Sequence, residues 1–336
     1  MNILYIGNDL VKKTNYNSSM NTLCEHLSSS EINITRASSK NNKVLRLLDM
    51  LLKVLVNYKK VSYVIIDTFS TSNFYYALLV SQLARLLKLK YIPILHGGNL
   101  PSRLINNKKL SNLIFRYSYR NVAPSNYLKS EFNKYGFSAL LIPNILEIDN
   151  YKFKSRDIFK PNLLWVRAFD HIYNPTLAIN VLKQLKIKYP YSTLTMVGPI
   201  KDDSFGEVKK LIESLKLKDS VKITGVLKKE EWHKLAEDSD IFINTTNIDN
   251  TPVSVMEAMA LGLPVVSTNV GGLPYLIENN IDGLLVKNND TELMYNAINH
   301  LLTHKDVAIK IANKARIKTE SFSWGVIKQK WLEILY

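Results

Sequence analysis

The chain has 336 residues, of which 46% are hydrophobic, and a formal net charge of +15. This length favours two domains with buried cores and excludes a small stapled fold. The single cysteine, Cys24, excludes an internal disulfide, and no Cys and His residues have zinc-ligand spacing, which fits the cytoplasm. The first residues lack the basic region of a signal peptide, and no run of about 18 apolar residues predicts a membrane span.

The positive charge is concentrated in the first part of the chain. Residues 1–150 hold 19 Lys and Arg against 8 Asp and Glu, whereas the remainder holds 25 against 21. A basic half predicts an anionic partner, which could be nucleic acid, anionic lipid or a phosphorylated substrate. Because no helix-turn-helix, zinc-finger or aromatic RNA-binding motif is present, we expect no nucleic-acid partner.

Short β-branched runs alternate with helical patterns along the chain. Strand patterns occur at 2–7, 63–67, 91–95, 121–125 and 139–143, and again at 163–167, 193–198, 221–225, 241–246, 264–269 and 283–286. Such alternation predicts an α/β protein with parallel sheets covered by helices on both faces. We therefore expect two doubly wound, Rossmann-like domains, residues 1–150 and 151–318, joined by a polar segment.

Two further helical patterns have more than one interpretation. Residues 319–336 are expected to form a helix that packs back toward the first domain or, equally, against the second domain alone. The pattern at 42–60 has only a narrow polar stripe. It predicts either a helix buried between the sheet and its neighbours, or one that rests on an anionic membrane surface together with the basic segment 102–120.

The stretch "DNTPVSVME" places two acids around the expected start of a helix. Pro252 favours the first helical position, because its missing N–H would be unpaired there. Asp249 then precedes the helix, Glu257 lies on its second turn, and the helix N-terminus between them can bind an anion. Acids flanking an anion site suit the hydroxyls of a nucleotide sugar, whose diphosphate lies between ribose and sugar. Taken alone, two such acids are more often ordinary surface and helix residues.

The longer stretch "DNTPVSVMEAMALGLPVVSTNVGGLPYLIENNIDGLLV", residues 249–286, resembles the donor-binding segment of family-4 retaining glycosyltransferases of the GT-B fold. The resemblance implies two domains facing across a cleft, with the acceptor bound by the first and the nucleotide sugar by the second. It implies metal-independent sugar transfer with retention of configuration, no cofactor beyond a UDP- or GDP-linked donor, and a glycan or lipid-diphosphate-linked acceptor. Surface polysaccharide synthesis at the inner membrane face fits these expectations.

The resemblance also assigns roles to individual residues. Glu257 would bind the ribose hydroxyls, and Asp249, where a glutamate is usual, would hold the donor sugar. Arg167 would hold the diphosphate; the lysine usual about five residues later is absent, and Lys201 is either its substitute or a solvated loop lysine. His96 would line the cleft opposite the donor sugar. The remaining predicted donor-binding residues are Gly97, Gly98, Gly198, Gly225, Val226, Asn250, Thr251, Pro252 and Val253.

We thus predict a catalytic set of His96, Arg167 and Asp249 and no metal site. The acids of "DSD" at 238–240 resemble a metal-binding pair but are expected to be structural. Two alternatives stay open. One is a catalytically degenerate subunit that acts as a binding or scaffold protein, and the other is a GT-B phosphorylase or epimerase.

Overall fold

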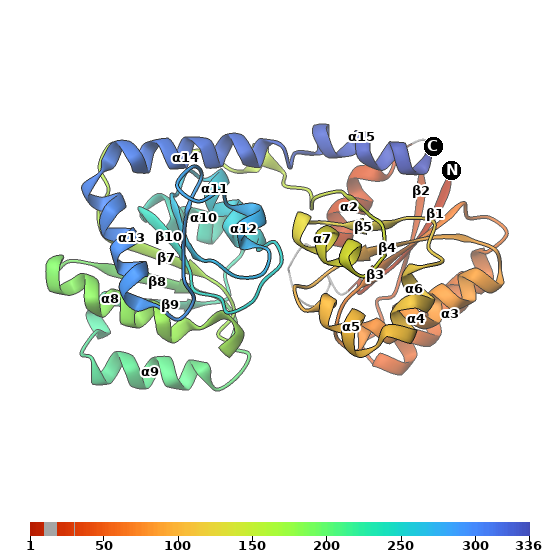
Figure 1. The fold of residues 1–336 in the computed structure, drawn as a ribbon, viewed down its shortest axis with the longest axis horizontal. Coiled ribbons are helices and arrows are strands. Elements are labelled where there is room, and N and C mark those ends of the chain that lie inside the picture. The colour runs from red at the N-terminus through yellow and green to blue at the C-terminus, as the bar shows by residue number, and fades with distance from the viewer. Residues whose placement is uncertain (10–18, 30) are drawn as a thin grey trace. The chain divides into compact units, whose positions relative to one another are not determined.

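The structure is a computed structural model that describes residues 1–9, 19–29 and 31–336. These residues form two compact units, Met1–Ile145 with Phe322–Tyr336, and Leu146–Ser321 (Figure 1). Each unit contains a six-stranded parallel sheet with helices packed against it. The α/β class predicted from the alternating pattern is therefore confirmed.

The sheet of the first unit has the order β2-β1-β3-β4-β5-β6. Its strands are β1 Asn2–Ile6, β2 Asn33–Ala37, β3 Tyr63–Thr68, β4 Lys90–Leu95, β5 Asn121–Ala123 and β6 Ala139–Leu141. The sequence analysis did not predict β2, which pairs with β1 at the edge of the sheet. Most residues of this edge strand remain partly exposed, so its sequence, "NITRA", lacks the apolar run that identified the others.

Helices cover both faces of this sheet because alternate strand residues point to opposite sides. Leu4 and Ile6 of β1 belong to a core shared with α3, α4, α6 and α7, whereas Ile3 and Tyr5 belong to one shared with α2 and α15. The C-terminal helix α15 buries Trp331 in this second core. The helices are α2 Ser19–Leu27, α3 Lys43–Asn57, α4 Asn73–Leu86, α5 Leu100–Asn106, α6 Lys108–Phe115, α7 Asn126–Lys134 and α15 Trp324–Leu335.

The sheet of the second unit has the order β12-β11-β10-β7-β8-β9. Its strands are β7 Asn162–Val166, β8 Thr193–Val197, β9 Val221–Gly225, β10 Ile241–Asn244, β11 Val265–Thr268 and β12 Leu284–Val286. Its helices are α8 Pro175–Lys188, α9 Ser204–Ser214, α10 Lys229–Glu237, α11 Val253–Ala260, α12 Leu273–Leu276, α13 Thr291–Thr303 and α14 Lys305–Glu320. The strand order reverses between β7 and β10, and in such sheets ligands bind where loops diverge from this point.

The helix α11, which follows β10, is held in place by a buried arginine. Arg156 donates hydrogen bonds to the carbonyl oxygens of Ala236 at 2.7 Å and Ser239 at 3.0 Å, near the end of α10. It also donates to the carbonyl oxygen of Gly262, just beyond α11, at 2.8 Å. One side chain thus bonds backbone carbonyl groups at and just beyond the ends of two helices.

The start of α11 differs by one residue from the prediction. The helix begins at Val253, and Pro252 is the N-cap residue, with an extended backbone. Proline fits this position for the same reason, since an N-cap residue also needs no intrahelical N–H bond. Among the described residues, no helix has both the length and the apolar character needed to cross a bilayer.

Candidate donor-binding site

The reversal of strand order brings together two predicted site residues that are far apart in sequence. Arg167 follows β7, and Asp249 lies in the loop after the neighbouring strand β10. The Arg167 guanidinium donates a hydrogen bond to the Asp249 carboxylate, and both side chains are about five-sixths buried. The guanidinium also lies 4.8 Å from the Tyr173 ring centre. These residues were predicted to contact different parts of a donor, and in the structure they pair with each other.

Glycines bring the backbone close to both members of this pair. A Cβ on Gly198 would lie 1.7 Å from the Arg167 carbonyl oxygen, and one on Gly272 would lie 1.8 Å from that of Asn250. The Gly272 N–H donates to the Asp249 carbonyl oxygen at 2.9 Å. The turn at 271–272 therefore supports the loop that carries Asp249.

Three buried polar atoms near the start of α11 have no hydrogen-bond partner. They are Arg167 Nε, Thr251 Oγ1 and Ser254 Oγ. Buried polar groups are normally paired, so unpaired ones in a native site need an explanation such as a ligand or ordered water. N–H and O–H donors of this kind, like the positive end of a helix such as α11, suit phosphate oxygens. Sequence reasoning missed Ser254, although its position in the first helical turn was a usable signal.

Glu257 is buried on the second turn of α11, with 4% of its surface exposed. Its Oε1 accepts a hydrogen bond from the Tyr151 hydroxyl at 2.7 Å and lies 3.0 Å from the Lys229 ammonium. Sequence reasoning missed both partners. Lys229 belongs to the same "ITGVLKKEEW" segment that suggested Gly225 and Val226, whereas Tyr151 carries no sequence signal.

The environment of this carboxylate extends to a histidine on α10. The rings of His233 and Tyr151 lie 4.9 Å apart, and His233 Nε2 is buried without a partner. Burial and the nearby Lys229 ammonium lower the pKa of His233 to about 4. The imidazole is therefore neutral at pH 7 and adds no charge to the site.

The other predicted donor residues lie at strand ends of the same sheet. Gly225 ends β9 with φ +73° and accepts a hydrogen bond from the Gly198 N–H at 2.9 Å. Val226 is 68% exposed, as a residue that contacts a base would be. Asn250 is buried beside Asp249, whose Oδ1 accepts the Asn250 N–H at 2.8 Å. Lys201 is exposed, and its N–H donates to the Phe169 carbonyl oxygen.

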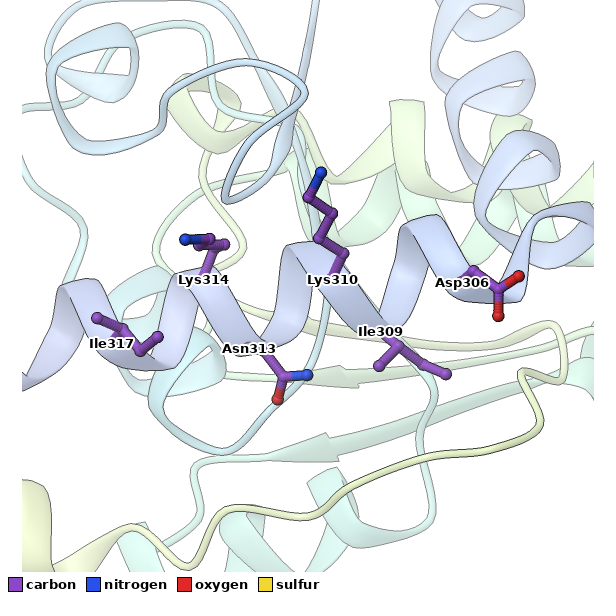
Figure 2. Close-up of a pocket in the computed structure, with 6 residues that line it drawn as sticks. All are labelled: Asp306, Ile309, Lys310, Asn313, Lys314 and Ile317. Carbon is purple, nitrogen blue, oxygen red and sulfur yellow. The ribbon is translucent and has the colours of Figure 1, made fainter.

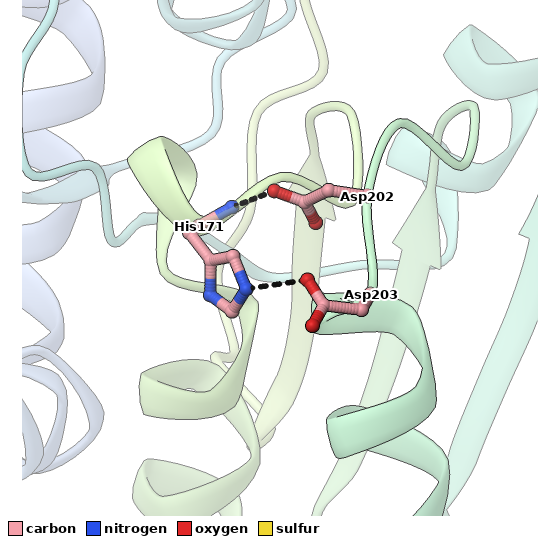
Figure 3. A group of neighbouring side chains, drawn as sticks. All are labelled: His171, Asp202 and Asp203. Atoms are coloured by element: carbon pink, nitrogen blue, oxygen red, sulfur yellow. Dashed lines mark hydrogen bonds and ion pairs between the residues drawn. The ribbon is translucent and has the colours of Figure 1, made fainter.

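Next to Lys201, a histidine and two aspartates form a group in which Asp202 is partly buried and the other two are exposed (Figure 3). His171 Nε2 lies 2.8 Å from Asp203 Oδ1, and the His171 N–H donates to Asp202 Oδ2 at 2.8 Å. The hydrogen bond with Asp203 is the main reason that the pKa of His171 is raised. The ligand atoms of the three lie within 4.8 Å of one another, so they could hold a cation.

The aspartate that ends the "DSD" stretch is already bound by protein groups. Asp240 lies 3.8 Å from the Arg156 guanidinium and accepts a hydrogen bond from Asn162 at 3.2 Å. These contacts connect the start of β10 to the domain-joining segment and to β7. Contacts of this kind fit the structural role expected for this acid.

His96 directly follows β4 in the first unit. The strand order of this sheet also reverses, at the step between β1 and β3. The His96 Nε2 is 3.0 Å from Asp67 Oδ1, which also accepts the Tyr5 hydroxyl at 2.8 Å. The Phe69 ring stacks on the imidazole at 4.9 Å. Gly97 follows with φ +86°. Sequence reasoning missed Asp67 and Tyr5, although an acid that ends the buried strand "YVIID" was a usable signal.

The second unit also has a surface hollow that lies away from these groups. It has a volume of about 390 Å³ and lies along α14 (Figure 2). Its lining residues are Asp306, Ile309, Lys310, Asn313, Lys314 and Ile317. Because they all come from one face of a single helix, they form an open surface and not an enclosed site.

Known proteins resemble the chain in both sequence and fold. It is 29% identical over 200 residues to the amylovoran biosynthesis glycosyltransferase AmsK of Erwinia amylovora, covering 56% of this chain and 48% of AmsK. It is 31% identical over 172 residues to the putative colanic acid biosynthesis glycosyltransferase WcaL of Escherichia coli, covering 47% of this chain and 41% of WcaL. The matches thus span less than half the length of either relative.

Solved structures share the fold over nearly the whole chain. Anabaena Alr3699/HepE in complex with UDP has a TM-score of 0.79 at 20% identity, covering 100% of this chain and 99% of that one. Sucrose-phosphate synthase from Thermosynechococcus elongatus has a TM-score of 0.81 at 14% identity, covering 99% and 98%. The fold is therefore that of GT-B glycosyltransferases. Residues 149–318 match the family described as glycosyl transferases group 1, and the chain belongs to that family.

Proposed function

We propose that the protein is a retaining, metal-independent glycosyltransferase that moves a sugar from a nucleotide-sugar donor to a glycan or lipid-linked acceptor in surface polysaccharide synthesis. The observation that carries this proposal is the donor site after β7 and β10. It combines the Arg167–Asp249 pair, the unpaired buried atoms at the start of α11, and the buried Glu257. The names of AmsK and WcaL, and the complexes of HepE with UDP and UDP-glucose, support it.

The paired charges suggest how a donor would enter. A diphosphate would replace the Asp249 carboxylate on the Arg167 guanidinium, and the α11 N-terminus would provide further N–H groups. Asp249 would then be released to accept hydrogen bonds from hydroxyls of the donor sugar. As the glycosidic bond breaks, negative charge grows on the leaving diphosphate, which these same groups are placed to stabilise.

Glu257 would recognise the ribose. The Tyr151 hydroxyl and the Lys229 ammonium both contact its Oε1. The Glu257 carboxylate would accept hydrogen bonds from the ribose hydroxyls. The base would meet the backbone near Gly225 and Val226, a kind of contact that fits a UDP or a GDP donor equally well.

His96 would bind the donor sugar from the first unit. Because the Asp67 carboxylate accepts, Nε2 of a neutral His96 carries the proton and Nδ1 is an acceptor. An acceptor nitrogen fits a sugar hydroxyl, which can donate. The basic charge of the first domain would favour a lipid-diphosphate-linked acceptor at the inner, anionic face of a membrane.

The stereochemical course has its own test. We propose front-face transfer, in which the leaving phosphate assists deprotonation of the acceptor. NMR spectroscopy of the product should show the anomeric configuration of the donor, and activity should persist in EDTA. An inverted product would contradict the first statement, and loss of activity in EDTA would contradict the second.

Donor binding is tested by thermal unfolding with UDP, GDP, ADP, CMP and dTDP. A nucleotide at a hundredfold its dissociation constant should stabilise the protein by about 2.7 kcal/mol. Glu257→Gln should abolish this effect, whereas the exposed control Glu213→Gln should keep it. If no nucleotide stabilises the wild type, the proposal fails. Stabilisation without sugar transfer to any acceptor would favour the scaffold alternative.

A further inference from the structure

The helix α3 is apolar on two opposite sides. Its inner side packs Met50 and Val54 into the core of the first unit. Its outer side exposes six large apolar residues, each with 47–66% of its surface in contact with solvent. They are Val44, Leu45, Leu48, Leu52, Leu55 and Val56. The helix is therefore not buried on all sides, so the first interpretation of its sequence pattern is wrong.

The six residues form one continuous surface, which we call the α3 outer face. Since each residue turns an α-helix by about 100°, their spacing confines them to an arc of roughly 120°. The neighbouring helix α4 adds Tyr75 and Leu79, which are 45% and 44% exposed (Figure 1). Soluble proteins rarely expose contiguous apolar patches larger than a few hundred Å² unless the patch binds something.

Positive charge surrounds this apolar surface. Residues 40–120 hold 14 Lys and Arg against 2 Asp and Glu. One of these acids, Asp67, is buried beside His96. Lys43 begins α3, and Lys59 and Lys60 follow its end; all three are exposed. An apolar strip with cationic ends suits a helix that lies in the plane of a membrane surface.

We infer that the α3 outer face is the docking surface for an anionic phospholipid membrane. The leucines would enter the boundary between headgroups and acyl chains, and the flanking lysines would bind lipid phosphates. This inference deepens the proposed function and rests on it for its purpose, because docking would bring the chain to a lipid-linked acceptor.

Charge argues against a second copy of the chain as the occupant. A symmetric dimer through α3 would place the same patch on both sides of the interface, with its lysines facing each other. Like charges across an interface are unfavourable. An anionic bilayer accommodates both features at once, because it offers hydrocarbon for the leucines and phosphate for the lysines.

The test is flotation of the full chain with vesicles of phosphatidylcholine, alone or with phosphatidylglycerol. The wild type should float with the phosphatidylglycerol vesicles at low salt, and high salt should weaken this binding. The variant Leu48→Gln, Leu52→Gln, Leu55→Gln should lower the floated fraction at least tenfold. A control with exposed isoleucines of the second unit changed, Ile158→Gln, Ile187→Gln, Ile317→Gln, should float like the wild type.

Several outcomes would overturn the inference. They are no flotation of the wild type, equal flotation with both kinds of vesicle, equal loss in both variants, or dimerisation of the wild type that the α3 changes abolish. Nucleotide-induced thermal stabilisation, measured on the same samples, separates the two proposals. If it persists in the α3 variant while flotation is lost, the fold and the donor site are intact and the docking surface is supported. If both the stabilisation and the flotation persist in the α3 variant, the docking inference is refuted and the proposed function is not.

Discussion

Replacing Gly272 by alanine should disturb the donor site through a single methyl group. A Cβ at this position would lie 1.8 Å from the Asn250 carbonyl oxygen, and ordinary contact begins at 3.4 Å. Gly272 has φ −87°, which alanine adopts without strain, so the contact alone should decide the effect. Because the obstacle is backbone, the loop that carries Asp249 and Asn250 must retreat by about 1.6 Å.

The expected cost has two parts. Overpacking of this kind lowers the free energy of unfolding by about 1–3 kcal/mol. A misplacement of about 1 Å near a reacting group can lower activity about 100-fold. We therefore expect both a lower unfolding midpoint in urea and a dissociation constant for the nucleotide that rises at least tenfold in calorimetry.

Gly206→Ala is the matched control for this change. No atom would lie within 4 Å of its new Cβ, and Gly206 is part of α9. Alanine in place of a helical glycine should stabilise the protein by up to about 1 kcal/mol and leave nucleotide binding unchanged. If Gly272→Ala binds nucleotide and unfolds like the wild type, the turn at 271–272 does not position the donor loop and the reasoning is refuted.

Two further predictions concern the histidines. The pKa of His233 is lowered to about 4 in the fold, against about 6.5 in an unfolded chain, so the unfolded state binds more protons between these values. Stability should therefore fall as the pH drops through this window, by about 1–2 kcal/mol, which is less than the full shift would give because solvent screens the partly exposed imidazole. Urea unfolding of His233→Phe should show a weaker pH dependence, and equal profiles would contradict this. Asp67→Asn should release His96 and lower kcat/KM by about tenfold to 100-fold, the loss seen when orienting partners of other functional histidines are removed. Calorimetry should show an unchanged nucleotide affinity. A matching loss of affinity would contradict a role for Asp67 that is confined to the first unit.

The sequence predicted most strands because parallel strands buried on both faces appear as continuous apolar runs. The edge strand β2 was not predicted, because a strand at an exposed edge needs no continuous apolar run. The loop and helix from Asp249 to Glu257 were also predictable, since cap, helix and acids are all local features. The one-residue error at Pro252 reflects two neighbouring positions that both tolerate a missing N–H.

Contacts made by strand order could not be predicted in this way. Arg167 meets Asp249, and Tyr5 meets Asp67, because β7 lies beside β10 and β1 beside β3. Periodicity does not contain the order of strands in a sheet. The α3 outer face was ambiguous for a related reason, because the periodicity of apolar residues does not distinguish a side that faces the core from one that faces solvent.

The pairing of charges in the candidate donor site bears on its selectivity. Arg167 is neutralised by Asp249, and Lys229 lies against Glu257, so the site presents two ion pairs and not two free cations. A simple phosphate that took Arg167 would leave Asp249 partly buried without a partner, which is unfavourable. A nucleotide sugar can supply sugar hydroxyls to Asp249 and ribose hydroxyls to Glu257 while its diphosphate takes Arg167. The same two acids that would repel a bare anion therefore favour a ligand that carries hydroxyl groups on both sides of its phosphates.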